Sequence, residues 1–523
     1  MASESQPITS GKDGRVLLIT SLVSSLIMLD STIVAVSLPA IGHSFGVPFS
    51  SLEWVISAYL LTYASLLLGS GAFGDLRGRK LTLIAGLIIF GTASAACGLA
   101  PSVLTLNIAR AIQGVGGAML LTAALAVIGT TFDGPRRGAA VAIWGAYLGV
   151  ALTLGPVLGG IITRYLGWRW VFLVNVPACA VLIIASARSI TESHDPEAKR
   201  LDWAGMLTFS PGLLLLTWGL ISGNDAGWDS LPVLLMFAGS IICLVAFVLS
   251  QKHQRRPMID LSLFSHRSFR GAVFAMIGYG ATAQVMVFYL PLYLQNAYGF
   301  NPLVAGLAML PFPLPMVLAP RLTLRLSKTW SGRKLLTTGL MITALGNILF
   351  WGVARTGLSY PIFVLTMIVA GTGAGLLNGE TVRVLTSSVP PERSGMASGI
   401  ASTTRLFGIL VGVAGLGAIL AAIAGRDFIN LATHPGLSMT TLERLVSHVT
   451  SGDLHEAVKD LPVNIRTHTL QAGQLAFSRG FGIASLAAAA IAAISAILSF
   501  YYISATDPAP QPTGRISAAP DTA

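Results

Sequence analysis

Charged side chains are scarce in this chain. Asp, Glu, Lys and Arg make up 11% of its 523 residues, hydrophobic residues make up 53%, and the mean hydropathy is +0.73. Soluble domains are about 25% charged, because their surfaces must be hydrated. The composition therefore excludes a soluble globular protein of this length and predicts an all-α polytopic membrane protein.

Cysteine is nearly absent, and histidine avoids the apolar stretches. Cys97, Cys179 and Cys243 lie in such stretches without Cys-x-x-Cys spacing, so the sequence predicts neither a disulfide framework nor a zinc site. All eight histidines lie in loops or at the ends of apolar stretches. Proton chemistry at membrane depth must therefore use carboxylates, and we predict no bound metal.

A nucleotide-binding sequence is also missing. The chain has no Walker A motif, and glycine clusters such as Gly114, Gly116 and Gly117 lack the G-x-G-x-x-G spacing. This pattern disfavours ATP as a direct energy source, and we predict no cofactor.

Long apolar stretches are abundant. A spanning helix needs about 20 apolar residues, and the first candidate contains Asp30 and is too long for a signal-peptide core, so we expect it to be retained. Fourteen candidate spans lie near 16–40, 52–73, 81–100, 104–130, 138–162, 169–188, 203–222, 231–250, 271–297, 302–324, 335–354, 360–386, 396–424 and 476–504.

Lys and Arg gather in alternate short loops, which predicts that these loops and both termini are cytoplasmic. The distribution accounts for the net charge of +11 without nucleic acid, which would require a contiguous basic face. The basic loops contain Arg77, Arg79 and Lys80; Arg136 and Arg137; Arg188, Lys199 and Arg200; Lys252, Arg255, Arg256, Arg267 and Arg270; and Arg325, Lys328, Arg333 and Lys334.

The fifth apolar stretch has one face without side chains. At about 100° per residue, its glycines and Pro156 fall within one arc of roughly 140°, so another backbone can approach closely. Pro156 also removes the hydrogen bond to Leu152 and kinks the helix. A tightly packed bundle helix without further role is the alternative. The residues of this face are Gly145, Gly149, Gly155, Pro156, Gly159 and Gly160.

Similar glycine and basic residues recur about 257 and 254 residues apart, which predicts two related halves. The expected domains are a cytoplasmic tail (1–13), a six-helix bundle (14–200), an inserted hairpin (201–268), a second six-helix bundle (269–505) and a cytoplasmic tail (506–523). The loop 425–474 has amphipathic spacing at Leu442, Leu445, Val446 and Val449, which predicts a helical cap.

Several motifs together resemble the major facilitator superfamily, and within it the fourteen-helix branch of drug:proton antiporters. Gly71 to Lys80 resembles the loop signature between the second and third helices, and Gly149 to Gly160 resembles the antiporter signature of the fifth. Leu29 to Pro39 and Trp168 to Pro177 resemble signatures of the first and sixth helices. Further similarity covers Asn107 to Gly117 and Pro390 to Gly408. The resemblance implies the major facilitator fold.

The resemblance also implies roles for individual residues. Arg110, with Gln113 and Gly114, is assigned to a proton pathway. The signature loop is a latch that holds the cytoplasmic ends together in one conformation and releases them in the other. Its matching positions are Gly71, Asp75, Arg77, Gly78, Arg79 and Lys80.

Ionisable residues inside spans are functional candidates because each is costly at bilayer depth. Asp30 and Arg110 lie at similar depths and could pair, either for proton exchange at Asp30 or as a permanent structural ion pair. Glu380 and Arg405 could form a second pair, with Arg383 competing for Glu380 from the same helical face. A purely structural role is the alternative there, because charges near helix ends snorkel to water.

Aromatic and amide side chains are candidates to line a cavity for lipophilic molecules, cationic ones among them. For each of them, simple packing is the alternative. The candidates are Tyr59, Trp144, Tyr147, Gln284, Phe288 and Tyr289.

The sequence thus predicts a proton-driven, monomeric exporter of lipophilic drugs or antiseptics in a bacterial inner membrane, working by alternating access. One alternative is an exporter, importer or uniporter of one defined metabolite or antibiotic, and the Gly-Pro stretch disfavours an importer or uniporter. A membrane enzyme or receptor is the other, and it is disfavoured because the spans contain neither a metal cluster nor a nucleophile–base pair.

Overall fold

The computed structural model is helical throughout its described part, with fourteen helices long and apolar enough to cross a membrane. This confirms the prediction of an all-α polytopic fold. The described residues are 11–47, 49–132, 134–194, 202–254, 257, 259–327, 329–389, 394–433, 437–451, 454–459 and 461–504.

Two helical bundles flank an inserted hairpin. The first bundle comprises α1 (Gly11–Phe45), α2 (Phe49–Arg77), α3 (Arg79–Gly98), α4 (Val103–Thr131), α5 (Gly134–Tyr165), α6 (Trp170–Leu173) and α7 (Asn175–Ser189). The hairpin comprises α8 (Trp203–Ala226) and α9 (Leu231–His253). After η1 (Leu261–Ser265), the second bundle comprises α10 (Arg267–Gly278), η2 (Tyr279–Gln284), α11 (Met286–Asn296), α12 (Pro302–Ala308), α13 (Pro313–Leu326), α14 (Gly332–Thr356), α15 (Tyr360–Leu377), α16 (Glu380–Ser387), α17 (Ser394–Ala432), α18 (Met439–Ser451), α19 (Leu454–Ala457) and α20 (Val463–Tyr502).

Side-chain caps begin several of these helices. Ser102, Asp202, Asn301 and Ser331 each accept a hydrogen bond from a backbone N–H in the first turn of the helix that follows. These N–H groups have no partner within the helix, so the caps satisfy donors that would otherwise need water. At the far end of α14, Gly357 takes a left-handed conformation that ends the helix.

The ninth and tenth spans are interrupted helices. A π-helical turn, η2, separates α10 from α11 at Tyr279–Gln284. In the tenth span α12 ends before Pro311, and α13 begins at Pro313. Interrupted helices of this kind occur at membrane depth only where protein or a water-filled cavity surrounds them. Both interruptions lie in the second bundle.

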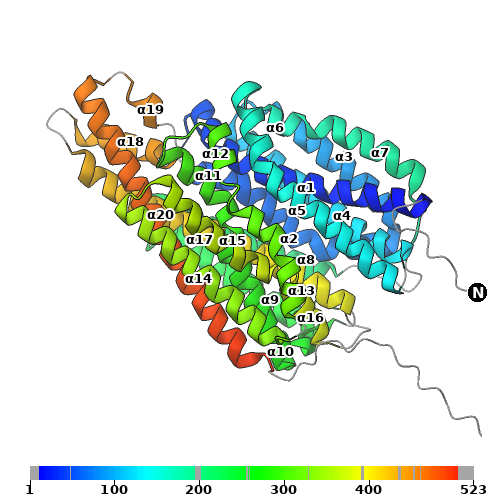
Figure 1. The fold of residues 1–523 in the computed structure, drawn as a ribbon. Coiled ribbons are helices and arrows are strands. Elements are labelled where there is room, and N and C mark those ends of the chain that lie inside the picture. Colours follow the sequence, from blue (N-terminus) through cyan, green and yellow to red (C-terminus); the bar gives the residue numbers. More distant parts are fainter. Residues whose placement is uncertain are drawn as a thin grey trace, which may run out of the picture.

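Figure 1 shows the first bundle, blue to cyan, beside the second bundle, green to red. The hairpin bridges them. The Trp218 ring of α8 lies 6.2 Å from the Trp54 ring of α2, and the Asn224 amide donates to the Ala418 carbonyl of α17 at 2.6 Å. The inserted helices therefore contact both halves of the molecule.

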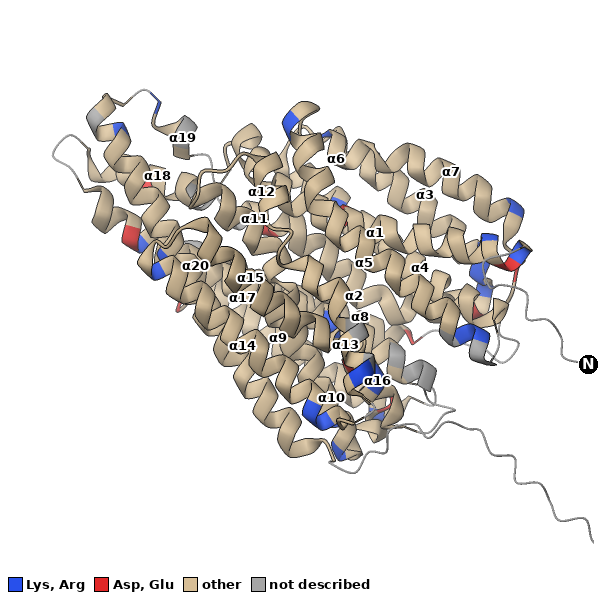
Figure 2. Ribbon diagram, viewed as in Figure 1, with Lys and Arg blue, Asp and Glu red and all other residues tan. Residues whose placement is uncertain are grey.

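Lys and Arg residues concentrate at one end of the helices, as Figure 2 shows for the ends of α7 and α10. We call this the basic end; it includes Arg77 at the end of α2, Arg188 at the end of α7 and Arg267 at the start of α10. It is the end that the sequence predicts to face the cytoplasm.

The described part of segment 425–474, expected to be a loop with a helical cap, is mostly helical. α17 extends to Ala432 and α20 already begins at Val463, so both membrane helices continue into the segment that we expected to be a loop. Between them, α18 buries Leu442, Leu445 and Val449. The predicted amphipathic helix is therefore present, and its apolar face packs against the protein.

Candidate functional site

Asp30 and Arg110 meet inside the first bundle. Arg110 Nη1 in α4 donates a hydrogen bond to Asp30 Oδ2 in α1, with 2.7 Å between the two atoms. Both side chains are at most 1% exposed. Arg110 also donates through Nε to the Val55 carbonyl of α2 at 2.9 Å. The pair therefore joins three helices, and its predicted formation is confirmed.

Two amide side chains complete the coordination of this carboxylate. Gln113 Nε2 and Asn175 Nδ2 each donate to Asp30 Oδ1 at 2.9 Å, and Arg110 donates to Gln113 Oε1 at 2.8 Å. All three of these contacts to Asp30 are made by N–H donors. We call Asp30, Arg110, Gln113 and Asn175 the Asp30 cluster.

A further layer of hydrogen bonds holds the amides in place. Ser94 of α3 accepts from Gln113 at 3.3 Å and from Asn175 at 3.0 Å, and it donates to the Phe172 carbonyl at 2.9 Å. The Cys97 thiol lies 3.7 Å from Gln113 Oε1. Because each polar group has a partner, the Asp30 cluster is a satisfied buried network rather than an isolated charge.

Aromatic rings enclose the guanidinium. The Arg110 Cζ lies 4.2 Å from the centre of the Tyr59 ring and 5.8 Å from that of Phe172. Tyr59 is only 1% exposed, so in this conformation it covers Arg110 instead of lining a cavity, contrary to the expectation from sequence. A cation over an aromatic face is stabilised by the ring quadrupole.

Helix α5 packs directly on the part of α1 that follows Asp30. A Cβ on Gly155 would overlap Thr32 Oγ1, and one on Gly159 would lie 2.9 Å from the Ile33 carbonyl oxygen. Gly145, in contrast, has open space around it. The close approach predicted for this face is therefore made by its second part, next to the Asp30 cluster.

The same helix touches the second bundle. A Cβ on Gly160 would lie 2.5 Å from the Pro302 carbonyl oxygen of α12, and one on Gly306 of α12 would overlap the Pro156 carbonyl. A Cβ on Gly149 would lie 3.3 Å from α13. Helix α5 thus lies between α1 and the tenth span, and it connects the Asp30 cluster to the other half of the protein.

The signature loop at the basic end is held within the first bundle. Arg79 donates to Asp75 at 2.8 Å, and the Glu192 carboxylate accepts the backbone N–H groups of Lys80 and Leu81, each at 3.0 Å. Gly78 has φ 121° and a Cβ there would lie 2.6 Å from Glu192 Cδ. Only glycine fits this position, because both its backbone angle and its clearance exclude a side chain.

The other residues of the signature loop have less specific surroundings. Gly71 makes an ordinary packing contact with α4, and Arg77 is exposed at the end of α2. Sequence reasoning missed Glu192, which lies 112 residues after Lys80 and has no local signal of its function. A carboxylate at a helix N-terminus complements the helix dipole.

The second predicted pair is formed with the competing arginine. Arg383 donates to both Glu380 oxygens, at 2.8 and 2.5 Å, within one turn of α16. Arg405 of α17, which we expected as the partner of Glu380, makes no ion pair with an acid of the described residues. The i,i+3 geometry lets Arg383 reach Glu380 without any tertiary contact.

Glu53, which sequence reasoning missed, is a further buried carboxylate. It is 4% exposed near the start of α2, and it faces the second bundle at the end opposite the basic end. A Cβ on Gly417 of α17 would overlap Glu53 Oε1 and lie 2.6 Å from the Tyr289 hydroxyl. An acid inside the apolar run of the second span was the available signal.

The other cavity candidates make several different contacts. Trp144 donates to the Ser24 hydroxyl at 2.9 Å, and Tyr289 donates to the Val413 carbonyl at 2.5 Å. Phe288 is buried, and Tyr147 is 37% exposed. Gln284 donates to the Tyr279 hydroxyl at 2.8 Å inside the π-helical turn. The structure therefore supports packing roles for Phe288 and Tyr289.

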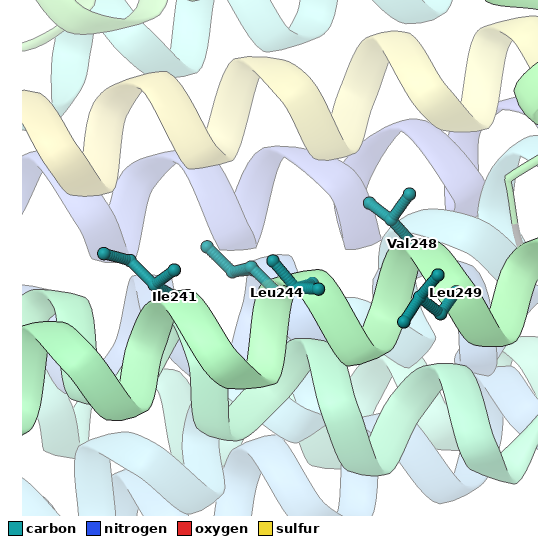
Figure 3. Close-up of a pocket in the computed structure, with 5 residues that line it drawn as sticks. Ile241, Leu244, Val248 and Leu249 are labelled. Carbon is teal, nitrogen blue, oxygen red and sulfur yellow. The ribbon is translucent and has the colours of Figure 1, made fainter.

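An apolar hollow of about 340 Å³ lies along α9, where Ile241, Leu244, Val245, Val248 and Leu249 form its wall, as Figure 3 shows. Its wall has almost no polar surface and comes from a single helix of the inserted hairpin. Such a surface suits acyl chains, and it contains none of the predicted cavity residues.

The comparisons with known proteins agree with this architecture. The sequence model described as "Major Facilitator Superfamily" matches residues 20–413. The chain belongs to this superfamily. The match covers the Asp30 cluster, the signature loop and the Gly-Pro face of α5, and it confirms the family expected from the motifs.

Its relatives include named drug efflux proteins. Multidrug resistance protein Stp of Mycobacterium tuberculosis is 32% identical over 407 residues, which are 78% of this chain and 75% of that protein. Multidrug efflux pump LfrA of Mycolicibacterium smegmatis is 29% identical over 491 residues, 92% of this chain and 95% of that protein. This protein is therefore a superfamily transporter with multidrug efflux relatives.

Solved structures show the same fold. A bacterial homolog of the human lysosomal transporter Spinster, in an inward-facing and occupied conformation, has a TM-score of 0.64 at 16% identity and covers 94% of this chain and 96% of that one. A D-xylose–proton symporter has a TM-score of 0.62 at 13% identity, covering 95% and 99%.

Proposed function

We propose that this transporter is a proton-coupled antiporter that exports lipophilic drugs or antiseptics, cationic ones among them. The names of the relatives support export of drugs, since Stp and LfrA are named for multidrug resistance and efflux. We place it as a monomer in a bacterial inner membrane with both termini in the cytoplasm. The positive charge at the basic end supports this orientation.

The observation that carries the proton coupling is the position of Asp30. Its carboxylate is fully buried, and it holds Arg110 of α4 and Asn175 of α7 to α1. A proton that binds Asp30 neutralises the carboxylate and leaves the Arg110 charge without its counter-ion. A buried unpaired charge is strongly unfavourable, so protonation must be accompanied by movement of α1 relative to α4.

Movement of α1 reaches the second bundle through α5. Gly155 of α5 faces the Thr32 side chain, and Gly159 faces the Ile33 backbone, just after Asp30. The same face of α5 touches the backbone of α12 at Gly160. A shift of α1 therefore changes the contact between the halves, because at Gly159 and Gly160 no side chain lies between the backbones to absorb it.

In the proposed cycle, Asp30 takes up a proton from the external side and releases it to the cytoplasm. The substrate moves outward in the opposite conformational step. Asp75 and Arg79 in the signature loop form an ion pair with each other, within the first bundle, which fits a conformation with the latch released.

Purified protein in proteoliposomes tests the proposal. We expect an imposed proton gradient to drive uptake or release of a lipophilic dye without ATP, and a protonophore to stop it. Empty liposomes and liposomes with Asp30→Asn protein are the controls. Flux that requires ATP and ignores the proton gradient would refute the antiporter.

A further inference from the structure

Arg405 is a cation at membrane depth with no acidic partner among the described residues. It lies eleven residues after the start of α17 at Ser394, or about 16 Å along the helix axis. Its side chain is partly exposed. A charge at this depth must be hydrated or paired, and the partial exposure of Arg405 leaves its guanidinium accessible to water or to a ligand.

Two tyrosines are near Arg405. Tyr63 in α2 and Tyr279 in η2 are both within electrostatic range of its guanidinium. The Tyr63 hydroxyl is buried and has no hydrogen-bond partner among the described residues. The Tyr279 hydroxyl accepts from Gln284, which leaves its own hydrogen available to donate.

The π-helical turn places these groups. Tyr279 and Gln284 are the first and last residues of η2, and a Cβ on Gly280 would lie 2.5 Å from the Arg405 carbonyl oxygen. The turn is therefore pressed against α17 at the level of Arg405. π-helical turns of this kind are rare and are often found at functional sites.

Each of these three groups can donate a hydrogen bond. The guanidinium has five N–H donors and no acceptor, and both phenols have a hydrogen to give. Two other buried acids of the described residues already have arginine partners, since Asp30 binds Arg110 and Glu380 binds Arg383. A fixed positive charge with further donors near it complements a carboxylate or another oxyanion.

We infer that Arg405, Tyr63 and Tyr279 form a binding site for the anionic group of a lipophilic acid, so that amphipathic acids are among the exported molecules. The inference rests on the proposed export function and adds a substrate class to it. Tyr63 belongs to the first bundle, and Arg405 and Tyr279 belong to the second. The site therefore changes shape whenever the halves move relative to each other.

Three pyrene probes with different head groups test the charge preference: 1-pyrenebutyrate, its methyl ester and (1-pyrenebutyl)trimethylammonium. Binding to purified protein in nanodiscs is measured by energy transfer from tryptophan, with empty nanodiscs as background. We expect the acid to bind on the order of tenfold more tightly than the ester, the gain typical of hydrogen bonds to a charged group. Equal binding of acid and ester would overturn the inference.

Variants assign the preference to this site. Arg405→Gln should abolish the difference between acid and ester, whereas Arg405→Lys should keep part of it. Arg355→Gln is the matched control, because Arg355 stacks on Trp351 at the far end of α14. If Arg405→Gln still binds the acid as tightly as the unchanged protein does, the inference is wrong.

Removal of single hydroxyls covers the case in which Arg405→Gln fails to fold. Tyr63→Phe and Tyr279→Phe should each weaken binding of the acid about threefold to tenfold and leave the ester unchanged. If both variants bind the acid as tightly as the unchanged protein does, the proposed site is contradicted. Proton-driven flux of the cationic probe in proteoliposomes is scored separately, so loss of antiport there refutes the proposed function and not the anion site.

Discussion

Asp30 and Arg110 are 80 residues apart in the sequence, and their ion pair links two helices. The Glu380–Arg383 pair, in contrast, lies within one turn of α16. Asp30 and Arg110 are at most 1% exposed, but Arg383 is 37% exposed. Breaking the first pair leaves a buried charge unless whole helices shift. Breaking the second leaves an arginine that can extend into water. Of the two pairs, only the first joins separate helices, and it is therefore the one that we propose couples protonation to the conformation of the protein.

The two acids also differ in their other hydrogen-bond partners. The Asp30 cluster has two amide donors and a serine behind them, and it adjoins the packing of α5 on α1. Glu380 has Arg383 as its ion-pair partner on the same helix. Burial alone does not distinguish the two acids, because Glu380 is also only 3% exposed. The distinction lies in which elements the bonds connect.

Asp30→Asn should cause the largest loss of proton-driven export. The amide keeps the shape of the side chain but cannot exchange a proton at this position, so we expect proton-driven export to fall to background while substrate binding persists. Flux and binding are measured on the same proteoliposome preparation. Asp13→Asn is the matched control, since Asp13 is an exposed acid on the same helix paired with Arg136. An Asp30→Asn protein that still couples export to proton entry would remove Asp30 from the mechanism.

Gly159→Leu should disturb the packing of α5 on α1, which connects the Asp30–Arg110 pair to the second bundle. The new side chain would meet the Ile33 backbone, where a Cβ alone is already 2.9 Å from the carbonyl oxygen. We expect export to drop by on the order of a hundredfold with some protein still in the membrane, because overpacking displaces a backbone. Gly145→Leu on the same helix faces open space and should transport normally. Normal transport by Gly159→Leu would disprove the close-contact argument.

Asn175→Ala should have an intermediate effect. It removes one donor from Asp30 and one from Ser94, and it leaves the Arg110 ion pair intact. We expect about a tenfold loss of proton-driven export, corresponding to one hydrogen bond to a charged group. The control is Asn347→Ala, which empties a buried asparagine site of α14. Equal losses in both variants would indicate a general effect on stability, and the assignment of Asn175 to the cluster would fail.

Glu380→Gln should have the smallest effect. The amide oxygen can still accept a hydrogen bond from Arg383, whose partly exposed side chain gains hydration. We expect export to change by less than about twofold, because the bond lies within one turn of α16 and Arg383 can reach water when the bond weakens. Proton-driven flux at equal protein level is the measurement. A loss as large as that of Asp30→Asn would mean that the two pairs are functionally equivalent after all.

Some features of this protein were determined by the sequence alone. The fourteen spans follow from local hydropathy, because a stretch of about 20 apolar residues is stable in a bilayer wherever it occurs. The charges inside spans and the glycine face of α5 were also visible, since both are departures from a uniform apolar composition. The partnership of Asp30 with Arg110 could be predicted from their similar depths in the membrane.

Tertiary structure decided the remaining contacts of the site. Asn175 was visible only as part of a motif, and its bond to Asp30, 145 residues away, depends on the packing of α7 against α1. Arg405 could be placed in depth but not in rotation, so the sequence paired it with Glu380, while in the structure Glu380 is paired with Arg383. Hydropathy fixes how deep a residue lies because the bilayer acts on each helix separately. Which side chains meet depends on how neighbouring helices rotate and pack, and this is set by the whole set of surfaces at once.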